Sequence, residues 1–226
     1  MRQKCRGFDL TSHPEPQDAR ASSNPFFVPP LRTERLLIRE LEETDLNSCV
    51  DLFVDIAWNN PELTPEEDSA QRLGWLRWTI GGYRQFAQLY QPPLGERAII
   101  HASTGEFLGL VGYVPSFEPF ERLAAFGDNA KAGRTMELGL FWALHTKAQG
   151  KGYATEAAAA LVEHAFTTLA VDRIIATTEH DNLASVEVMR RLGMQIEKYT
   201  KVHPGLQVVG LLTAPASINS DTSRAI

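Results

Sequence analysis

The chain has 226 residues, 43% of them hydrophobic and 9% aromatic, a composition that predicts a folded globular protein rather than a disordered one. Its net charge of −6 argues against a broad basic surface for nucleic acid, and no stretch approaches the ~18 uninterrupted apolar residues of a membrane span. Cys5 and Cys49 form neither a metal motif nor a disulfide framework, and residues 1–8 lack the apolar core of a secretory signal. We therefore expect a cytoplasmic protein with no metal, no nucleic-acid partner and no membrane partner.

The two ends of the chain differ from its middle. Residues 1–30 are rich in Ser, Pro and charge, which predicts a flexible N-terminal arm whose last part can lie against the body. Residues 214–226 are small and polar and predict a flexible tail. The stretch between them, residues 31–213, is expected to form a single domain without internal repeats.

The first half of that domain predicts a strand followed by two helices. Residues 35–39 predict a first strand, and Thr44 can cap a helix over 45–58. One side of that helix is expected to be apolar and to carry Leu46, Val50, Phe53, Val54 and Ala57. The run Thr64-Pro65-Glu66-Glu67 is a strong helix start, and the helix can reach Leu89 with a break at Gly81-Gly82. Cys49 lies within the first helix and is expected to be a small core residue.

The second half predicts further strands and two helices. A hairpin is expected over 97–101 and 106–114, followed by an irregular segment over 117–133. The remaining elements are a strand over 135–144, a helix over 153–169, a strand over 173–178, a helix over 182–192, and strands over 195–203 and 206–212 that turn at Pro204-Gly205. This order predicts an α/β domain with a mixed sheet and helices on its faces.

A glycine-containing turn joins the strand over 135–144 to the next helix. It reads Gln149-Gly150-Lys151-Gly152-Tyr153-Ala154. Two glycines at such a turn let backbone N–H groups converge, and the helix N-terminus adds partial positive charge. Lys151 adds a mobile cation and Thr155 a hydroxyl. The turn therefore predicts a phosphate-binding loop.

Two common phosphate loops do not fit this spacing. A Walker loop needs Ser or Thr directly after the lysine, but Gly152 follows Lys151. A dinucleotide fingerprint needs Gly or Ala where this chain has Thr155, and an acidic residue ending the next strand ~20 residues further on. Glu179 lies too far along, and Asp172 begins its strand instead of ending it. A nucleotide-dependent enzyme is thus disfavoured.

The pattern Gln/Arg-x-x-Gly-x-Gly/Ala is met by Gln149, Gly152 and Ala154. Here the chain resembles the GCN5-related N-acetyltransferase family, in particular its ribosomal-protein-alanine acetyltransferase branch. The resemblance covers about residues 31–213 and is carried by residues 31–39, 150–157, 182–185 and 191–194. It implies the acyl-CoA N-acyltransferase fold, with a mixed, mostly antiparallel sheet splayed at the cofactor. It also implies acetyl-CoA as cosubstrate and direct attack by a primary amine in a ternary complex.

The family pattern also assigns cofactor contacts. It implies that the strand backbone at Trp142, Ala143 and Leu144 and the amide of Asn182 bind the pantetheine arm, which for Asn182 is compatible with Asp181 capping the helix. The pyrophosphate would lie on Gln149, Gly150, Lys151, Gly152, Tyr153, Ala154 and Thr155. From Glu137-Leu138-Gly139 to the loop this chain is about two residues longer than many relatives, so the strand bulge that splays the sheet is not fixed by sequence.

The resemblance implies catalytic residues less directly. The position where relatives place a tyrosine acid, seven residues after Asn182, holds Met189, and Ser185 is the substitute we name. Glu137 is the best candidate for the base, because a carboxylate at the splay would be partly buried. Glu179, His180, His145 or a water chain are alternatives to Glu137.

The reaction needs no covalent enzyme intermediate, because neither cysteine lies near the cofactor segment. The acceptor is left open among protein N-termini, antibiotics and metabolite amines, as is the choice between monomer and homodimer. The first helices and residues 117–133 are expected to line the acceptor site. A non-catalytic acyl-CoA-binding module of the same fold is the alternative function.

Overall fold

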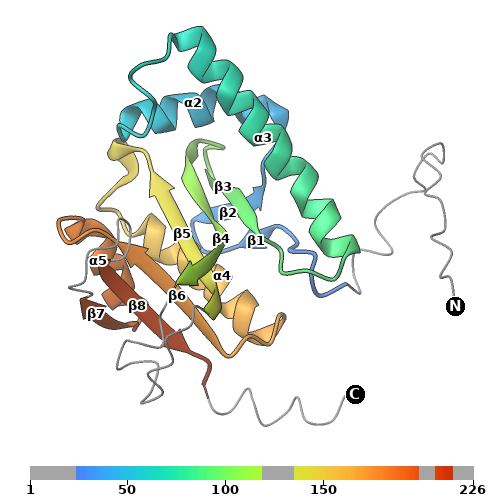
Figure 1. Ribbon diagram of the computed structural model, residues 1–226, viewed down its shortest axis with the longest axis vertical. Coiled ribbons are helices and arrows are strands. Elements are labelled where there is room, and N and C mark those ends of the chain that lie inside the picture. The colour runs from blue at the N-terminus through green and yellow to red at the C-terminus, as the bar shows by residue number, and fades with distance from the viewer. Residues whose placement is uncertain (1–23, 119–134, 199–206, 216–226) are drawn as a thin grey trace, which may run out of the picture.

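The computed structural model describes residues 24–118, 135–198 and 207–215 and is built on one eight-stranded sheet in the order β1-β2-β3-β4-β5-β6-β8-β7 (Figure 1). Neighbouring strands are antiparallel except β5 and β6, which are parallel. The strands are β1 (Leu31–Arg32), β2 (Leu36–Glu40), β3 (Gly95–His101), β4 (Phe107–Glu118), β5 (Thr135–Leu144), β6 (Arg173–Thr178), β7 (Gln195–Lys198) and β8 (Val208–Thr213). The predicted mixed, mostly antiparallel α/β fold is confirmed.

Helices cover both faces of this sheet (Figure 1). They are α2 (Leu46–Asp55), α3 (Pro65–Gln88), α4 (Tyr153–Thr167) and α5 (Leu183–Arg191). Residues of α4 and α5 pack in one apolar cluster with Leu36, Ile38 and Ile99, whereas α2 and α3 pack in a second cluster with Ala98 and Ile100. The alternation of side chains along β2 and β3 therefore separates the core into two layers.

The start and end of α2 differ from the prediction. Thr44 does not cap the helix, because a short 3-10 turn over Glu43–Asp45 precedes it, held by a reciprocal capping box between Glu42 and Asp45. The helix ends at Asp55 instead of residue 58, since Ala57 adopts the left-handed conformation with φ of 56°. The expected apolar side is wrong at its end: Val54 is 54% exposed and Ala57 is also exposed. Cys49 is buried in the core, as predicted.

Helix α3 begins where predicted and then continues without a break. Thr64 Oγ1 accepts from the Glu67 N–H, and the Glu67 carboxylate accepts from the Thr64 N–H. The break at Gly81-Gly82 is wrong, because the helix extends to Gln88. Tyr83, directly after the pair, is 3% exposed, and its hydroxyl donates to the Glu96 carbonyl. This tertiary packing outweighs the low helix propensity of the two glycines.

The described parts of the two ends pack on the domain. Val28 is 2% exposed, and Asn24 donates to the Ala87 carbonyl over 3.1 Å. The Ala214 N–H bonds the Asp172 carbonyl over 2.8 Å, so this residue belongs to the body rather than the tail. The rest of the arm and tail, residues 119–133 of the predicted irregular segment, and the turn at Pro204-Gly205 lie outside the described residues. Residues 117–118 belong to strand β4.

Among the described residues, no helix is both long enough and apolar enough to span a bilayer.

Candidate active site

Strands β5 and β6 separate after a short parallel contact. They pair only at Leu138 with Ile174 and at Gly139 with Ile175. Beyond this point residues 140–144 stay paired with β4, while no strand pairs with their other edge in the described part of the chain. The sheet is therefore splayed at the carboxyl end of β5, where the resemblance implies that a cofactor binds.

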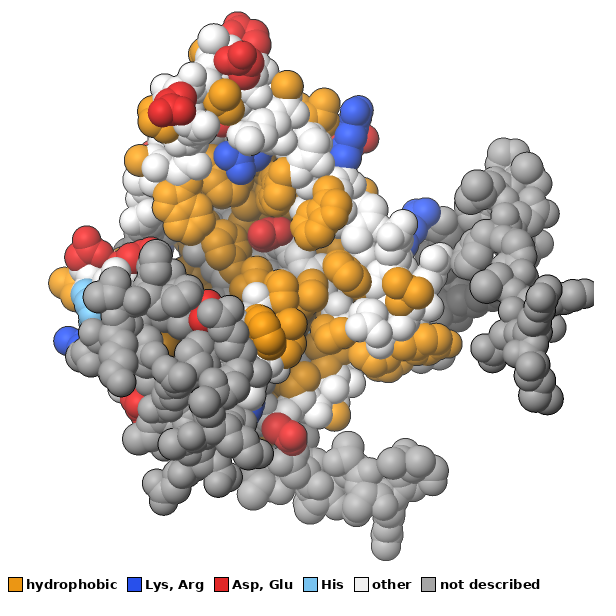
Figure 2. All heavy atoms as spheres, viewed as in Figure 1, with side chains coloured by type: hydrophobic (Ala, Val, Ile, Leu, Met, Phe, Trp, Pro, Cys, Tyr) orange, Lys and Arg blue, Asp and Glu red, His pale blue; other side chains and the backbone are white. Residues whose placement is uncertain are grey.

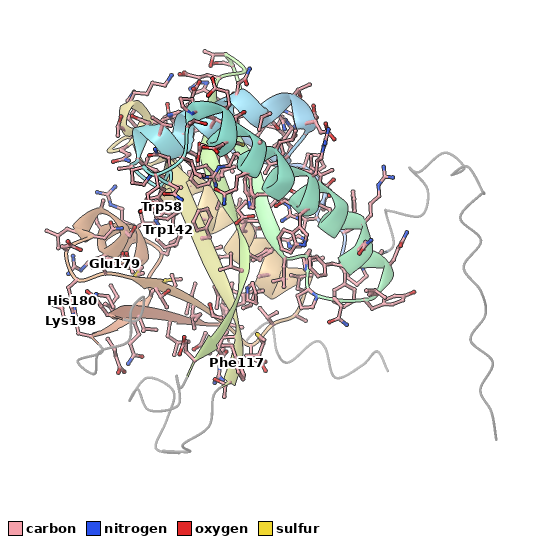
Figure 3. The ribbon with its side chains drawn as sticks, turned by 45° about the horizontal axis from the view of Figure 1, so that its top comes forward. Trp58, Phe117, Trp142, Glu179, His180 and Lys198 are labelled. Carbon is pink, nitrogen blue, oxygen red and sulfur yellow. The ribbon has the colours of Figure 1, made fainter. Side chains whose placement is uncertain are left out.

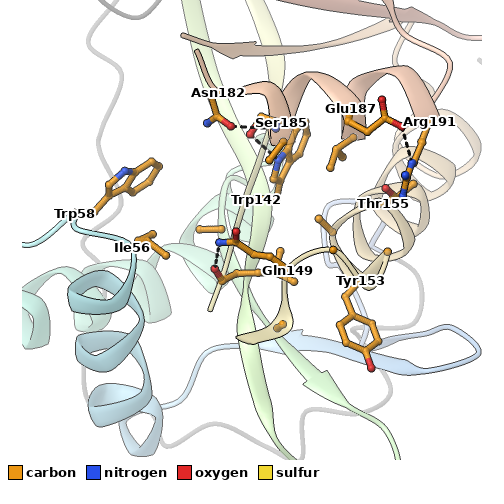
Figure 4. A pocket seen from close by; sticks show the side chains of 18 residues that line it. Ile56, Trp58, Trp142, Gln149, Tyr153, Thr155, Asn182, Ser185, Glu187 and Arg191 are labelled. Carbon is orange, nitrogen blue, oxygen red and sulfur yellow. Dashed lines mark hydrogen bonds and ion pairs between the residues drawn. The ribbon is translucent and has the colours of Figure 1, made fainter. Parts of the chain in front are cut away.

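A cavity of about 350 Å³ lies at this splay (Figure 4). Its walls come from the end of β5, the loop before α4, the first turn of α4, the inner side of α5 and the end of α2. Of the predicted site residues, the lining includes Trp142, Ala143, Leu144, Gln149, Gly150, Gly152, Tyr153, Ala154, Thr155, Asn182 and Ser185. Lys151 is exposed beside the cavity without lining it.

The loop before α4 has the conformation that an anion site requires. Gly150 and Gly152 have φ of 73° and 82°, in the left-handed region that glycine enters without a steric penalty. Gly152 is the N-cap residue of α4, and no side chain caps this helix. The backbone N–H groups of the first turn are thus available to an anion, and the residues present fit a pyrophosphate.

A carboxylate in the first turn of α4 fixes this loop to the start of the domain. Glu156 accepts from Thr33 Oγ1 over 2.5 Å, from the Arg35 N–H over 2.9 Å and from Arg35 Nε over 2.7 Å. Burial opposes ionisation of Glu156, but the bonds to Thr33 and Arg35 outweigh it and lower the pKa of the carboxyl. Arg35 also donates to the Lys151 carbonyl and lies 4.6 Å over the Tyr153 ring. The segment over 31–39 and the glycine loop are therefore joined directly by hydrogen bonds and an ion pair.

Asn182 and Ser185 face the cavity from α5 (Figure 4). Asn182 itself caps the helix, its Oδ1 accepting from the Ser185 N–H over 3.0 Å. Because only the oxygen is used, the Nδ2 hydrogens can still donate to a ligand. Trp142 Nε1 donates to Ser185 Oγ over 3.3 Å, so the serine hydroxyl hydrogen can point elsewhere.

Glu137 lies at the other end of β5 and does not line the cavity. It is 7% exposed, and Arg173 donates to both of its carboxylate oxygens through Nε and Nη2. Trp142 lies five positions further along the strand, at ~16 Å. The structure thus brings Ser185 to the predicted cofactor residues and leaves Glu137 outside the cavity.

The alternative bases also lie outside the lining. His145 bonds Asp55, while Glu179 and His180 are exposed directly after β6 (Figure 3). Met189, in the position of the family tyrosine, is fully buried, and its sulfur would lie 3.1 Å from a Cβ added at Gly210. That helix position therefore points to the core and away from the cavity.

Sequence reasoning missed several lining residues. Ile56 and Trp58 directly follow α2, and Glu187, Val188 and Arg191 lie on α5. Of the α5 residues, Val188 could have been found, because it lies three positions after Ser185 on the same helix face, and Arg191 lies three positions after Val188. The α2 residues carry no such signal. No group of three or more metal-ligating side chains occurs in the described ranges.

The model of the family described as "Acetyltransferase (GNAT) domain" matches residues 35–195 of this chain. The chain therefore belongs to this acetyltransferase family. It is 42% identical over 67 residues to the N-acetyltransferase YnaD of Bacillus subtilis (strain 168), a match covering 30% of this chain and 38% of YnaD. The fold is similar to an acetyltransferase from Agrobacterium tumefaciens str. C58, with a TM-score of 0.58 and 24% identity over 82% of this chain and 94% of that one. It is also similar to RimL, a ribosomal-protein acetyltransferase solved with coenzyme A, with a TM-score of 0.53 and 15% identity over 80% and 96%.

Proposed function

We propose that this chain transfers an acetyl group from acetyl-CoA to a primary amine, of a protein N-terminus or a small molecule, by direct attack in a ternary complex. The observation that carries the proposal is the cavity at the splay of β5 and β6, where an unpaired strand edge, a glycine loop and a helix N-terminus meet. The presence of coenzyme A in the similarly folded RimL supports it.

Each part of the cavity suits one part of acetyl-CoA. The free strand edge at Trp142–Leu144 offers backbone groups for the pantetheine amides, and Asn182 Nδ2 offers a further donor. The loop and first turn over 149–155 offer N–H groups for the pyrophosphate, with Lys151 as a nearby cation. When bound, acetyl-CoA supplies the thioester carbonyl that the amine attacks.

The chain's own contribution to catalysis is mainly positioning. Ser185 Oγ is held by Trp142 at the cavity wall and is proposed to donate its proton to the departing sulfur. The base role of Glu137 stays a prediction. Its bonds to Arg173 favour a structural role instead, in which case the amine proton leaves through water.

Direct attack also agrees with the environment of the described cysteine. Cys49 is fully buried on the side of the sheet covered by α2 and α3, and burial raises the pKa of its thiol to about 12. A protonated, buried thiol is a poor nucleophile. A covalent acetyl-cysteine step at Cys49 is therefore disfavoured.

Two measurements separate an enzyme from a non-catalytic binding module. Calorimetry should show acetyl-CoA binding to the full chain, and release of free thiol should follow addition of a suitable amine from a broad panel. Binding without thiol release from any amine would favour the module. Absence of acetyl-CoA binding would overturn the proposed cofactor site itself.

A further inference from the structure

The wall of the cavity opposite α5 is formed by the end of α2 (Figure 4). Ile56 and Trp58 line it there, facing Trp142 and Ser185. Trp58 is 55% exposed, an unusual state for the largest apolar side chain. Apolar side chains gather below α2 and α3 on the face shown in Figure 2. The side chains of Ile56 and Trp58 make this wall of the cavity apolar.

Three features fix the position of Trp58. Asp55 accepts from His145 Nδ1, from the Thr146 N–H and from Thr146 Oγ1 over 3.0, 2.7 and 2.8 Å, which ties α2 to the end of β5. Ala57 takes a left-handed φ of 56°, a conformation that costs ~1 kcal/mol for a residue with a side chain. The Trp58 N–H then bonds the Phe53 carbonyl over 2.8 Å. The chain therefore turns sharply after α2, and this turn places the Trp58 side chain in the cavity wall.

Aromatic contacts hold the indole ring in this place. The Trp58 ring stacks with Phe53 at 6.4 Å between centroids and 24° between planes, and it lies 6.0 Å from the Phe141 ring. Phe141 precedes Trp142, one of the cofactor residues. Successive strand residues point to opposite faces of the sheet, so Phe141 connects the aromatic wall to the backbone of β5, beside the edge proposed to bind the pantetheine arm, and not to the Trp142 side chain.

Charge distinguishes between classes of acceptor. The charged residues in the lining are Glu187 and Arg191, both on α5 and paired with each other over 2.9 Å. The nearest carboxylate to the aromatic wall along the chain, Asp55, is already occupied by His145 and Thr146. Among the described lining residues, a polyamine would find no free carboxylate and an acidic acceptor no free cation. The wall therefore favours a neutral body attached to the reacting amine.

We propose that the acceptor is a primary amine with an aromatic ring a few bonds from its nitrogen, and that Trp58 determines this specificity by packing against the ring. The inference rests on the proposed acetyl transfer. An aromatic pair contributes modestly beyond burial, so a several-fold preference is expected, not an absolute one. The ring can belong to a free arylalkylamine or to the first residue of a peptide.

The test compares two amines of similar size in the full chain, 2-phenylethylamine and 2-cyclohexylethylamine. The native chain should have a kcat/KM roughly fivefold higher for the aromatic amine. Trp58→Leu should abolish this ratio, whereas Trp58→Phe should keep most of it. Trp78→Leu is the matched control, because Trp78 is 67% exposed on α3 and does not line the cavity. It should leave the ratio unchanged.

Further arms separate the outcomes. A phenylalanine-led dipeptide amide distinguishes a peptide acceptor from a free amine, and spermidine represents polycations. Preference for spermidine, or a ratio unchanged in Trp58→Leu, would overturn the specificity inference while acetyl transfer stands. If no amine is acetylated, the proposed function fails first. A thermal unfolding transition like that of the native chain would show that Trp58→Leu is folded.

Discussion

The two ends of strand β5 differ in their surroundings. We call its start, around Glu137, the closed end, and residues 142–144 the open end. At its start, Glu137 is closed off by an ion pair with Arg173, and the next two residues pair with strands on both sides. At its end, residues 142–144 pair on one side only and line the cavity on the other. The candidate site therefore lies where backbone groups of β5 have no partner strand among the described residues, and not at the charged side chain of Glu137.

The largest predicted effect on the rate of acetyl transfer is that of Glu137→Gln, at the closed end of β5. If Glu137 is the base, the rate should fall ~10²-fold at neutral pH and partly return at high pH, where the amine deprotonates unaided. The ion pair instead predicts a rate loss that is equal at every pH and a lower stability, by about 1–3 kcal/mol because Arg173 is partly exposed. We expect the second result.

The measurement is a pH–rate profile together with thermal unfolding. Glu43→Gln is the matched control, since it removes an exposed ion pair with Arg77. It should change neither quantity measurably. Recovery of the Glu137→Gln rate at high pH would instead make the closed end part of the chemistry.

At the open end, Gly152→Val should raise the acetyl-CoA dissociation constant more than tenfold, or ~1.4 kcal/mol. A branched side chain is strained at a φ of 82°, and its Cβ would lie 3.4 Å from Arg35 Nη2. Gly105→Val is the control, with a φ of 72° and open space in a hairpin turn. It should cost similar strain without changing the affinity measured by calorimetry. Unchanged affinity in a folded Gly152→Val would remove the loop from the cofactor site.

A smaller effect is expected for Ser185→Ala, about three- to tenfold in rate, because a thiolate can leave without full protonation. The loss should grow when the thioester is replaced by a substrate with a poorer leaving group. Ser103→Ala, in the exposed hairpin turn, provides the control. An equal loss with both leaving groups would show that Ser185 positions the cofactor and does not donate a proton.

The smallest effect should come from segments that belong to neither end of β5. A chain shortened to residues 21–214 keeps the contacts of Asn24, Val28 and Ala214. It should melt within a few degrees of the full chain and keep its acetyl-CoA affinity, because the removed composition forms a poor core. A large drop in melting temperature would reveal a docked segment.

The open end could be predicted from sequence because its signal is local. The strands over 135–144 and 173–178 form with the predicted bounds, and the glycine loop between strand and helix has a spacing that excludes its competitors. Glycines in left-handed conformations and the start of a helix can be recognised from residue types alone.

The rest depends on contacts between distant residues. The partner of Glu137 is Arg173, 36 positions away, and no pattern near Glu137 announces it. Trp58 reaches the cavity only because Asp55 bonds Thr146 and because Ala57 turns the chain. The unbroken helix at Gly81-Gly82 likewise reflects the buried Tyr83 and not local propensity.

The most direct test of the account is the initial-velocity pattern of the full chain with acetyl-CoA and 2-phenylethylamine as varied substrates. Direct attack within one cavity predicts that double-reciprocal lines intersect, because both substrates must be bound before thiol is released. Gly152→Val should shift the acetyl-CoA dependence, and Trp58→Leu the amine dependence. Parallel lines would show a covalent acetyl-enzyme and contradict the ternary complex, and absence of thiol release with every amine would contradict the proposed function.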